Sequence, residues 1–160
     1  MKWLLLLSLV LVGCTKEEKK VQASPPGFSK TVLTSSKGGE KVWKLICDNV
    51  QIDGKKTNLT KLTLILYKDK KTSKITADNG ILDQDNETIE LFGNVEASED
   101  AEKIKLQTER LTWNEKEKRL TTESEITLQK EGIILSGRGF VADADFSSMK
   151  ITDGVRVKFK

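Results

Sequence analysis

The chain has 160 residues, of which 32% are charged and 37% hydrophobic. This length suits a single domain, since domains usually hold roughly 100–200 residues. The formal net charge of +3 is too small to indicate nucleic-acid binding. The chain contains no histidine, so the commonest general base and the commonest metal ligand are both missing. These values argue against a nucleic-acid-binding protein and against most enzymes.

The first thirteen residues have the form of a secretory signal peptide. Lys2 supplies the positive charge, residues 3–12 are almost entirely apolar, and Gly13 is a small residue directly before Cys14. The apolar run is too short to span a bilayer, which needs about 20 residues. The sequence Leu-Val-Gly-Cys at 11–14 resembles the lipobox of bacterial lipoproteins, whose cysteine receives lipid and becomes residue one after cleavage. This resemblance predicts lipidation of Cys14; the alternative is an ordinary signal peptide with a chance cysteine.

Residues 15–39 are charged at first and then contain Pro25, Pro26 and several glycines and serines, without apolar periodicity. Such a composition is typical of a flexible tether. We therefore divide the chain into a signal peptide at 1–13, a lipidated cysteine and tether at 14–39, and a folded domain at 40–160.

Apolar and polar residues alternate through the remainder of the chain, which predicts strands with one buried and one solvated face. Polar turns separate the strands at 68–71, 83–86, 114–117 and 143–145. The alternating sets are Trp43/Leu45/Cys47, Leu62/Leu64/Leu66, Ile75/Ala77, Ile89/Leu91, Ile104/Leu106, Leu111/Trp113, Ile126/Leu128, Ile133/Leu135 and Val155/Val157/Phe159.

These strands belong to four repeats of about thirty residues. Leu45, Ile75, Leu106 and Leu135 hold the same position in successive copies. A fixed period indicates stacked structural units. Such units must fold over to keep their apolar face from water, at about 25 cal/mol per Å². The sequence predicts an all-β fold: an antiparallel β-jellyroll, or folded-over two-walled trough.

The candidate site is the apolar lining of this trough. A plain core role is the simpler interpretation for any one residue, and the hypothesis is collective: two walls that do not seal leave a slot for a lipid tail. The candidate lining residues are Trp43, Leu45, Leu64, Leu66, Ile75, Leu91, Ile104, Leu106, Trp113, Leu128, Leu135 and Val155. A lysine cluster, Lys68, Lys70, Lys71 and Lys74, suits lipid phosphates, although a solvated hairpin tip is the simpler interpretation.

No catalytic or metal-binding constellation is recognised, and no cofactor is expected. Asp48, Asp78, Asp83 and Glu109 recur at repeat positions, which indicates a structural role at turns or strand ends. Serines and threonines have no histidine to activate them. Cys47 reads as a small buried hydrophobe. The chain ends on an apolar strand whose edge can pair with a partner's strand.

Ordered motifs over residues 40–159 resemble the LptC family, the periplasmic component of the lipopolysaccharide export machine. Similar motifs occur in the soluble relative LptA. The motifs are Trp-Lys-Leu at 43–45, Thr-Ala-Asp-Asn-Gly at 76–80, Leu-Phe-Gly-Asn-Val at 91–95, Leu-Gln-Thr-Glu-Arg-Leu at 106–111, Gly-Arg-Gly-Phe at 137–140 and Asp-Gly-Val at 153–155.

The resemblance implies a jellyroll that shelters the acyl chains of lipopolysaccharide. The family accepts the lipid from an inner-membrane ABC transporter, which docks at the first strands, and passes it to an LptA-like periplasmic protein at the last strands. The C-terminal docking residues implied here are Gly154, Val155, Val157 and Phe159. The alternative is an LptA-like or structural lipoprotein that uses its open edge only for protein assembly.

This sequence departs from the family in its anchor. LptC usually carries an uncleaved transmembrane helix, whereas a lipobox stands here. We expect lipid anchoring at the periplasmic face of the inner membrane. The outer membrane is the alternative, because Thr15 does not match the aspartate that retains lipoproteins in the inner membrane.

Overall fold

The computed structural model describes residues 21–22 and 30–159, and this part of the chain contains strands and turns but no helix. Accordingly, no helix within it is long and apolar enough to cross a membrane. The strands are β1 (Val21–Gln22), β2 (Thr31–Lys37), β3 (Glu40–Asp53), β4 (Lys56–Lys68), β5 (Lys71–Asp83), β6 (Thr88–Glu99), β7 (Ile104–Asn114), β8 (Arg119–Lys130), β9 (Ile133–Asp143) and β10 (Met149–Phe159).

The strands form one 10-stranded antiparallel sheet in chain order, from β1 to β10. Each repeat predicted from the sequence corresponds to one hairpin: β3–β4, β5–β6, β7–β8 and β9–β10. The predicted all-β trough is therefore confirmed. β10 is an edge of this sheet, with a neighbour on one side.

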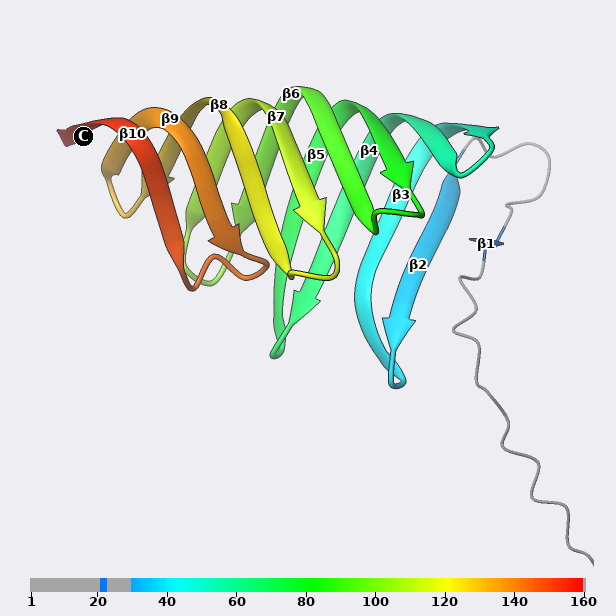
Figure 1. Ribbon diagram of the computed structural model, residues 1–160. Coiled ribbons are helices and arrows are strands. Elements are labelled where there is room, and N and C mark those ends of the chain that lie inside the picture. Colours follow the sequence, from blue (N-terminus) through cyan, green and yellow to red (C-terminus); the bar gives the residue numbers. More distant parts are fainter. Residues whose placement is uncertain (1–20, 23–29, 160) are drawn as a thin grey trace, which may run out of the picture.

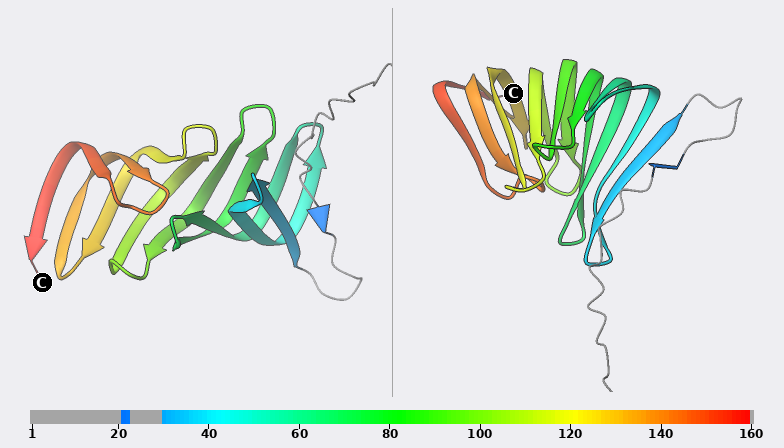
Figure 2. Two further views of the ribbon diagram at one scale, coloured as in Figure 1. Left: turned by 90° about the horizontal axis from the view of Figure 1, so that it is seen from below. Right: turned by 45° about the vertical axis from the view of Figure 1, so that its right-hand side comes forward.

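Each long strand bends near its middle, so that the sheet folds over into two walls (Figures 1 and 2). The bends coincide with register shifts in the pairs β5–β6, β6–β7, β7–β8, β8–β9 and β9–β10. Such bulges bend a strand and increase its local twist. At one of them Gly93 and Asn94 have φ angles of 78° and 48°, a conformation that glycine and asparagine tolerate best.

We call the two halves of the folded sheet the first and second wall. The first wall holds the strand halves that meet at the turns β2–β3, β4–β5, β6–β7 and β8–β9. The second wall holds those that meet at β3–β4, β5–β6, β7–β8 and β9–β10. The turns of both walls form a rim opposite the bends (Figure 1).

The core lies between the two walls. Inward side chains at alternate positions pack into one cluster, with Leu45, Leu64, Leu91, Leu106 and Phe140 each at 0% exposure. Burying such a side chain stabilises the fold by about 1.5–3 kcal/mol. Outward positions carry mainly threonine, lysine and glutamate. Packing across the walls thus supplies the main driving force for the bend.

The predicted domain boundary at residue 40 is wrong. β2 lies within the predicted tether, yet it pairs with β3 through Val32↔Ile46 and Leu33↔Leu45. Leu33 is buried in the core cluster. The hydrophobic burial of Leu33 and the ladder hydrogen bonds outweigh the loop tendency of the serines and glycines that follow.

Candidate functional site

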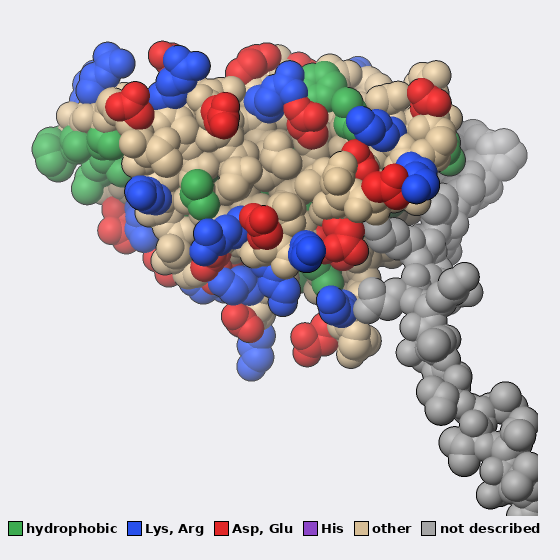
Figure 3. Space-filling model, viewed as in Figure 1, with side chains coloured by type: hydrophobic (Ala, Val, Ile, Leu, Met, Phe, Trp, Pro, Cys, Tyr) green, Lys and Arg blue, Asp and Glu red, His purple; other side chains and the backbone are tan. Residues whose placement is uncertain are grey.

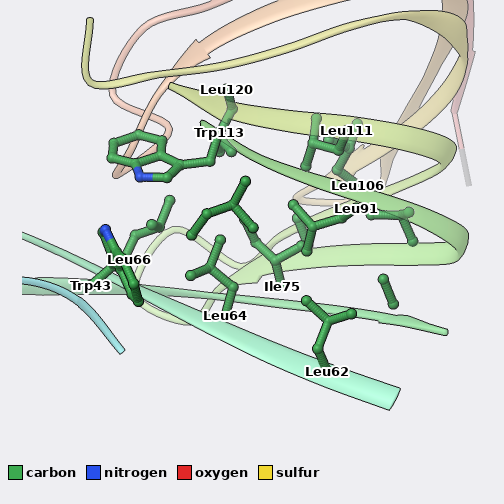
Figure 4. Packing of buried hydrophobic residues seen from close by; sticks show 14 of the residues in the cluster. Trp43, Leu62, Leu64, Leu66, Ile75, Leu91, Leu106, Leu111, Trp113 and Leu120 are labelled. Atoms are coloured by element: carbon green, nitrogen blue, oxygen red, sulfur yellow. The ribbon is translucent and has the colours of Figure 1, made fainter. Parts of the chain in front are cut away.

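Ten of the twelve candidate lining residues lie in the buried core cluster. Those on the first wall face Leu91 and Trp113 on the second wall, as Figure 4 shows for part of the cluster. Of the remaining two, Leu135 is half-buried against the cluster, and Val155 is 54% exposed at the C-terminal end. All of the candidate residues except Val155 are thus buried or half-buried at a common location between the walls.

The cluster also contains large residues that the candidate lining omitted. Leu111 and Leu120 flank Trp113, and alternation with Trp113 was a signal for Leu111. Phe140 packs against Phe146 with ring centroids 6.4 Å apart. Phe146 lies in the β9–β10 turn with φ 54°, where no periodic pattern points to burial.

The interior is closed to solvent along the central strands. The ten buried lining residues have exposures of 0–3%. Two hollows, of about 500 and 900 Å³, lie along the bends instead. Polar side chains such as Glu109, Arg110 and Arg138 line them, and none of the twelve candidate residues does. The slot expected between unsealed walls is therefore not seen along the central strands that the structure describes, and an acyl chain has room in the trough only if the walls separate.

Two polar contacts join the walls at the rim. In the first, the Glu115 contact, Ser35 Oγ donates to Glu115 Oε1 over 2.6 Å and Trp43 Nε1 donates to Glu115 Oε2 over 2.7 Å. Glu115 stands in the β7–β8 turn of the second wall, while Ser35 and Trp43 belong to β2 and β3. The trough is therefore closed by side chains far apart in sequence.

In the second, the Lys68 contact, Lys68 Nζ lies 2.9 Å from Asp145 Oδ1 and 3.4 Å from Asp143 Oδ2. The hydrogen bond to Asp145 raises the pKa of Lys68. Burial raises the pKa of Asp145, but hydrogen bonds from Lys68 and Ser147 outweigh it, so its pKa lies below the ordinary value. Lys68 is thus occupied by carboxylates and is not a free phosphate ligand.

Of the other three lysines in the cluster, Lys71 also forms an ion pair, and it shares its carboxylate partner with Lys130 outside the cluster. Lys71 and Lys130 each contact the Glu102 carboxylate, at 3.4 and 3.2 Å. Hydrogen bonds from Lys130 and Lys71 lower the pKa of Glu102. Lys70 and Lys74 are exposed. The cluster is accordingly a hairpin tip with local ion pairs.

Two of the recurring carboxylates, Asp78 and Asp83, accept hydrogen bonds within the fold. Asp78 accepts a hydrogen bond from Asn94 Nδ2 over 2.6 Å at a bend. Asp83 accepts three hydrogen bonds from Asp85 and Asn86 and orders the β5–β6 turn. Within residues 30–159 no group of three or more potential metal ligands lies together.

The two cysteines differ in what the structure shows of them. Cys14 lies outside the described residues. Cys47 is a buried free thiol whose pKa is raised to about 11, chiefly by burial and also by Asp48. Such a thiol stays protonated near neutral pH and is a poor nucleophile.

The C-terminal end of the trough is open and apolar. Val155, Val157 and Phe159 on β10 are 54%, 54% and 75% exposed, and Ile133 on β9 is 38% exposed. Figure 3 shows hydrophobic side chains gathered at this end. Gly154, with φ 62°, directly precedes them at the bulge of β10. The edge predicted to dock a partner is thus accessible.

Comparisons with known proteins agree with this architecture. A sequence profile described as "Lipopolysaccharide-assembly, LptC-related" matches residues 3–160. A solved structure with the same fold is LptH from Pseudomonas aeruginosa, described as the LptA-homologous periplasmic component of the lipopolysaccharide transport device. It is 12% identical, with a TM-score of 0.60 over 74% of this chain and 94% of LptH. A comparison with curated proteins finds no match.

Proposed function

This chain belongs to the LptC-related family of lipopolysaccharide-assembly proteins, and from this membership we propose that it binds lipopolysaccharide in the periplasm and transfers it along its trough. In this proposal it accepts the lipid from an inner-membrane ABC transporter and passes it to an LptA-like protein. The role is passive binding and transfer, without catalysis or a cofactor.

The observation that carries this proposal is the apolar interior, which extends from β3 to the open end at β10. The lining residues form one contiguous cluster, and the apolar side chains of β9 and β10 prolong it into solvent. An acyl chain gains about 0.8 kcal/mol for each methylene group that leaves water. A bound chain would also re-cover the side chains that separation of the walls exposes, which limits the net cost of opening.

The two ends of the sheet suit different partners in this proposal. The transporter docks at the N-terminal strands, and the LptA-like protein docks at Gly154, Val155, Val157 and Phe159. The free edge of β10 supports the second assignment, because an edge strand offers unpaired backbone groups for β-augmentation. Transfer would then continue from one apolar interior into the next.

The anchoring proposal rests on the first residues of the sequence. Lipidated Cys14 would hold the domain at the periplasmic face of the inner membrane, with 1–13 removed and residues up to about 30 serving as the tether. Two or three acyl chains give stable anchoring, whereas one is marginal. Radiolabelled palmitate incorporated into the wild-type chain but not into C14S, together with separation of inner from outer membranes, tests both points.

A photo-crosslinking experiment tests the transport proposal. A benzophenone amino acid at Leu106 faces the interior, and the same residue at the neighbouring Gln107 faces solvent. Capture of lipopolysaccharide at Leu106 but not at Gln107, in cells that express the full chain, is the expected result. Capture of protein alone at both positions would favour the alternative, a structural lipoprotein that uses its β-edge only for assembly.

A further inference from the structure

The Glu115 contact has the geometry of a closed gate. Both carboxylate oxygens of Glu115 are used, one by Ser35 and one by Trp43, at 2.6 and 2.7 Å. The donors lie 80 and 72 residues away in sequence, on the opposite wall. Hydrogen bonds to an ionised carboxylate are stronger than those between neutral groups. The Glu115 side chain, in a turn of the second wall, thus connects that wall to the strands β2 and β3 of the first wall.

Because the two donors are buried, the loss of their hydrogen bonds to Glu115 would destabilise the closed state. Trp43 is 1% exposed and Ser35 is 6% exposed, so neither can easily exchange Glu115 for water while the walls stay together. Loss of the carboxylate would leave a buried indole N–H without an acceptor, which is destabilising. Glu115 therefore adds to the core packing in holding the first wall closed at the rim.

A buried polar group close to this contact in the sequence lacks a hydrogen-bond partner among the described residues. Trp113 lies two residues before Glu115 on β7, and Figure 4 shows its ring on the same side of the cluster as that of Trp43. Trp113 Nε1 is buried and has no hydrogen-bond partner among the described residues. A buried unpaired donor weakens the closed state, and an opened trough lets it reach water or an oxygen of the ligand. Closed and open states are thus brought nearer in free energy.

We propose that Glu115 is the gate of the trough: its bonds to Ser35 and Trp43 hold the walls together, and their release admits an acyl chain. This inference rests on the proposed transport function, because the gate has meaning only if the interior receives lipid. The Lys68 contact joins the same walls farther along the rim, so it would also have to open. Entry thus proceeds by parting the rim rather than by threading through a preformed channel.

The test combines gate variants with the benzophenone at Leu106 in the full chain, in cells that make lipopolysaccharide. E115A removes both bonds. W43F keeps an aromatic ring but removes one donor, and serves if E115A fails to fold, which thermal unfolding of the purified chain reports. E117A removes an equal charge from an exposed position of the same turn and is the matched control. Acrylamide quenching of tryptophan fluorescence gives a second readout of opening.

E115A is expected to raise lipopolysaccharide capture on the order of five-fold, W43F to raise it less, and E117A to leave it unchanged. Equal capture in wild type and both gate variants, or lower capture with intact folding, overturns the gate. Failure of all variants to capture the lipid overturns the transport function itself, and the gate with it. Capture by E115A alone would support both, with a gate that is closed almost all the time.

Discussion

Gly139 provides a quantitative test of how the bend is built. Its φ of 71° lies in the left-handed region, and a Cβ at this position would overlap Oγ1 of Thr152 on β10. Thr152 Oγ1 also donates to the Arg138 carbonyl over 3.1 Å. The substitution Gly139→Ala therefore imposes two separate penalties, one on the backbone and one on the neighbouring side chain.

The free-energy costs of the two penalties can be separated by substituting a glycine at which only the backbone penalty applies. Gly132, in the β8–β9 turn, has φ 81° and nothing within 4 Å of a built Cβ, so Gly132→Ala should cost about 1–2 kcal/mol of unfolding free energy. Gly139→Ala must also displace the Thr152 hydroxyl and lose its hydrogen bond, which adds about 1–2 kcal/mol. The expected total is about 2–4 kcal/mol.

Guanidinium denaturation followed by tryptophan fluorescence gives these values, provided that the m-values agree among variants. Combining Gly139→Ala with Thr152→Ala removes the overlap with the hydroxyl and should recover about 1 kcal/mol relative to the two single variants added together. Equal losses for Gly139→Ala and Gly132→Ala, with no recovery in the double variant, would show that the close approach of β9 and β10 does not constrain the bend.

Three further outcomes are expected. Phe140→Ala, at a fully buried ring beside Phe146, should lower the free energy of unfolding by about 3–5 kcal/mol in the same assay; a loss below 1 kcal/mol would mean that the walls are not packed there. Because the folded pKa of Asp145 lies below its ordinary 3.8, its stabilisation is present above that pH and is lost as the pH falls through the folded value. The Tm difference between wild type and D145N should therefore shrink below pH 3.8, and a constant difference would contradict the pairing with Lys68. Val157→Lys, at an exposed position, should change stability by less than about 0.5 kcal/mol yet weaken co-purification with an LptA-like partner; unchanged co-purification would remove β10 from the docking surface.

The strands were predictable because their burial follows a local rule. Residues such as Leu64 and Leu106 alternate with polar neighbours, and alternation needs only the chain itself. The turns at 68–71, 83–86, 114–117 and 143–145 were likewise local, since Asp83 and Asn114 bond backbone groups two or three residues onward. The two-walled fold followed from these strands, because a one-sided apolar sheet has to be covered.

Features set by contacts between the walls were not predictable. Glu115 sits in a polar turn like many other glutamates, and its role depends on meeting Ser35 and Trp43 across the trough. Whether these side chains come into contact depends on how the two walls lie relative to each other, and a thirty-residue repeat does not predict that arrangement. Phe146 was missed for the same reason, since a turn residue becomes buried only when the opposite wall covers it. β2 was missed because its serines weaken the alternation and its pairing with β3 decides its structure.

The architecture is compatible with the proposed opening of the trough without unfolding. Among the strands that the structure describes, each pairs with its chain neighbours, and no ladder links one wall to the other except through the continuous strands at the bends. Parting the rim would therefore leave the ladder hydrogen bonds in place. It would break the side-chain packing between the walls, the Glu115 contact and the Lys68 contact. An acyl chain restores much of that apolar contact. In the proposed opening, the bulges at the bends would serve as hinges, because the ladder is already interrupted there between Phe92 and Val95 and between Thr122 and Glu125. A sheet built from consecutive hairpins can thus be rigid along each wall and compliant between them, which is the mechanical property that the proposed uptake of lipid through the rim would require.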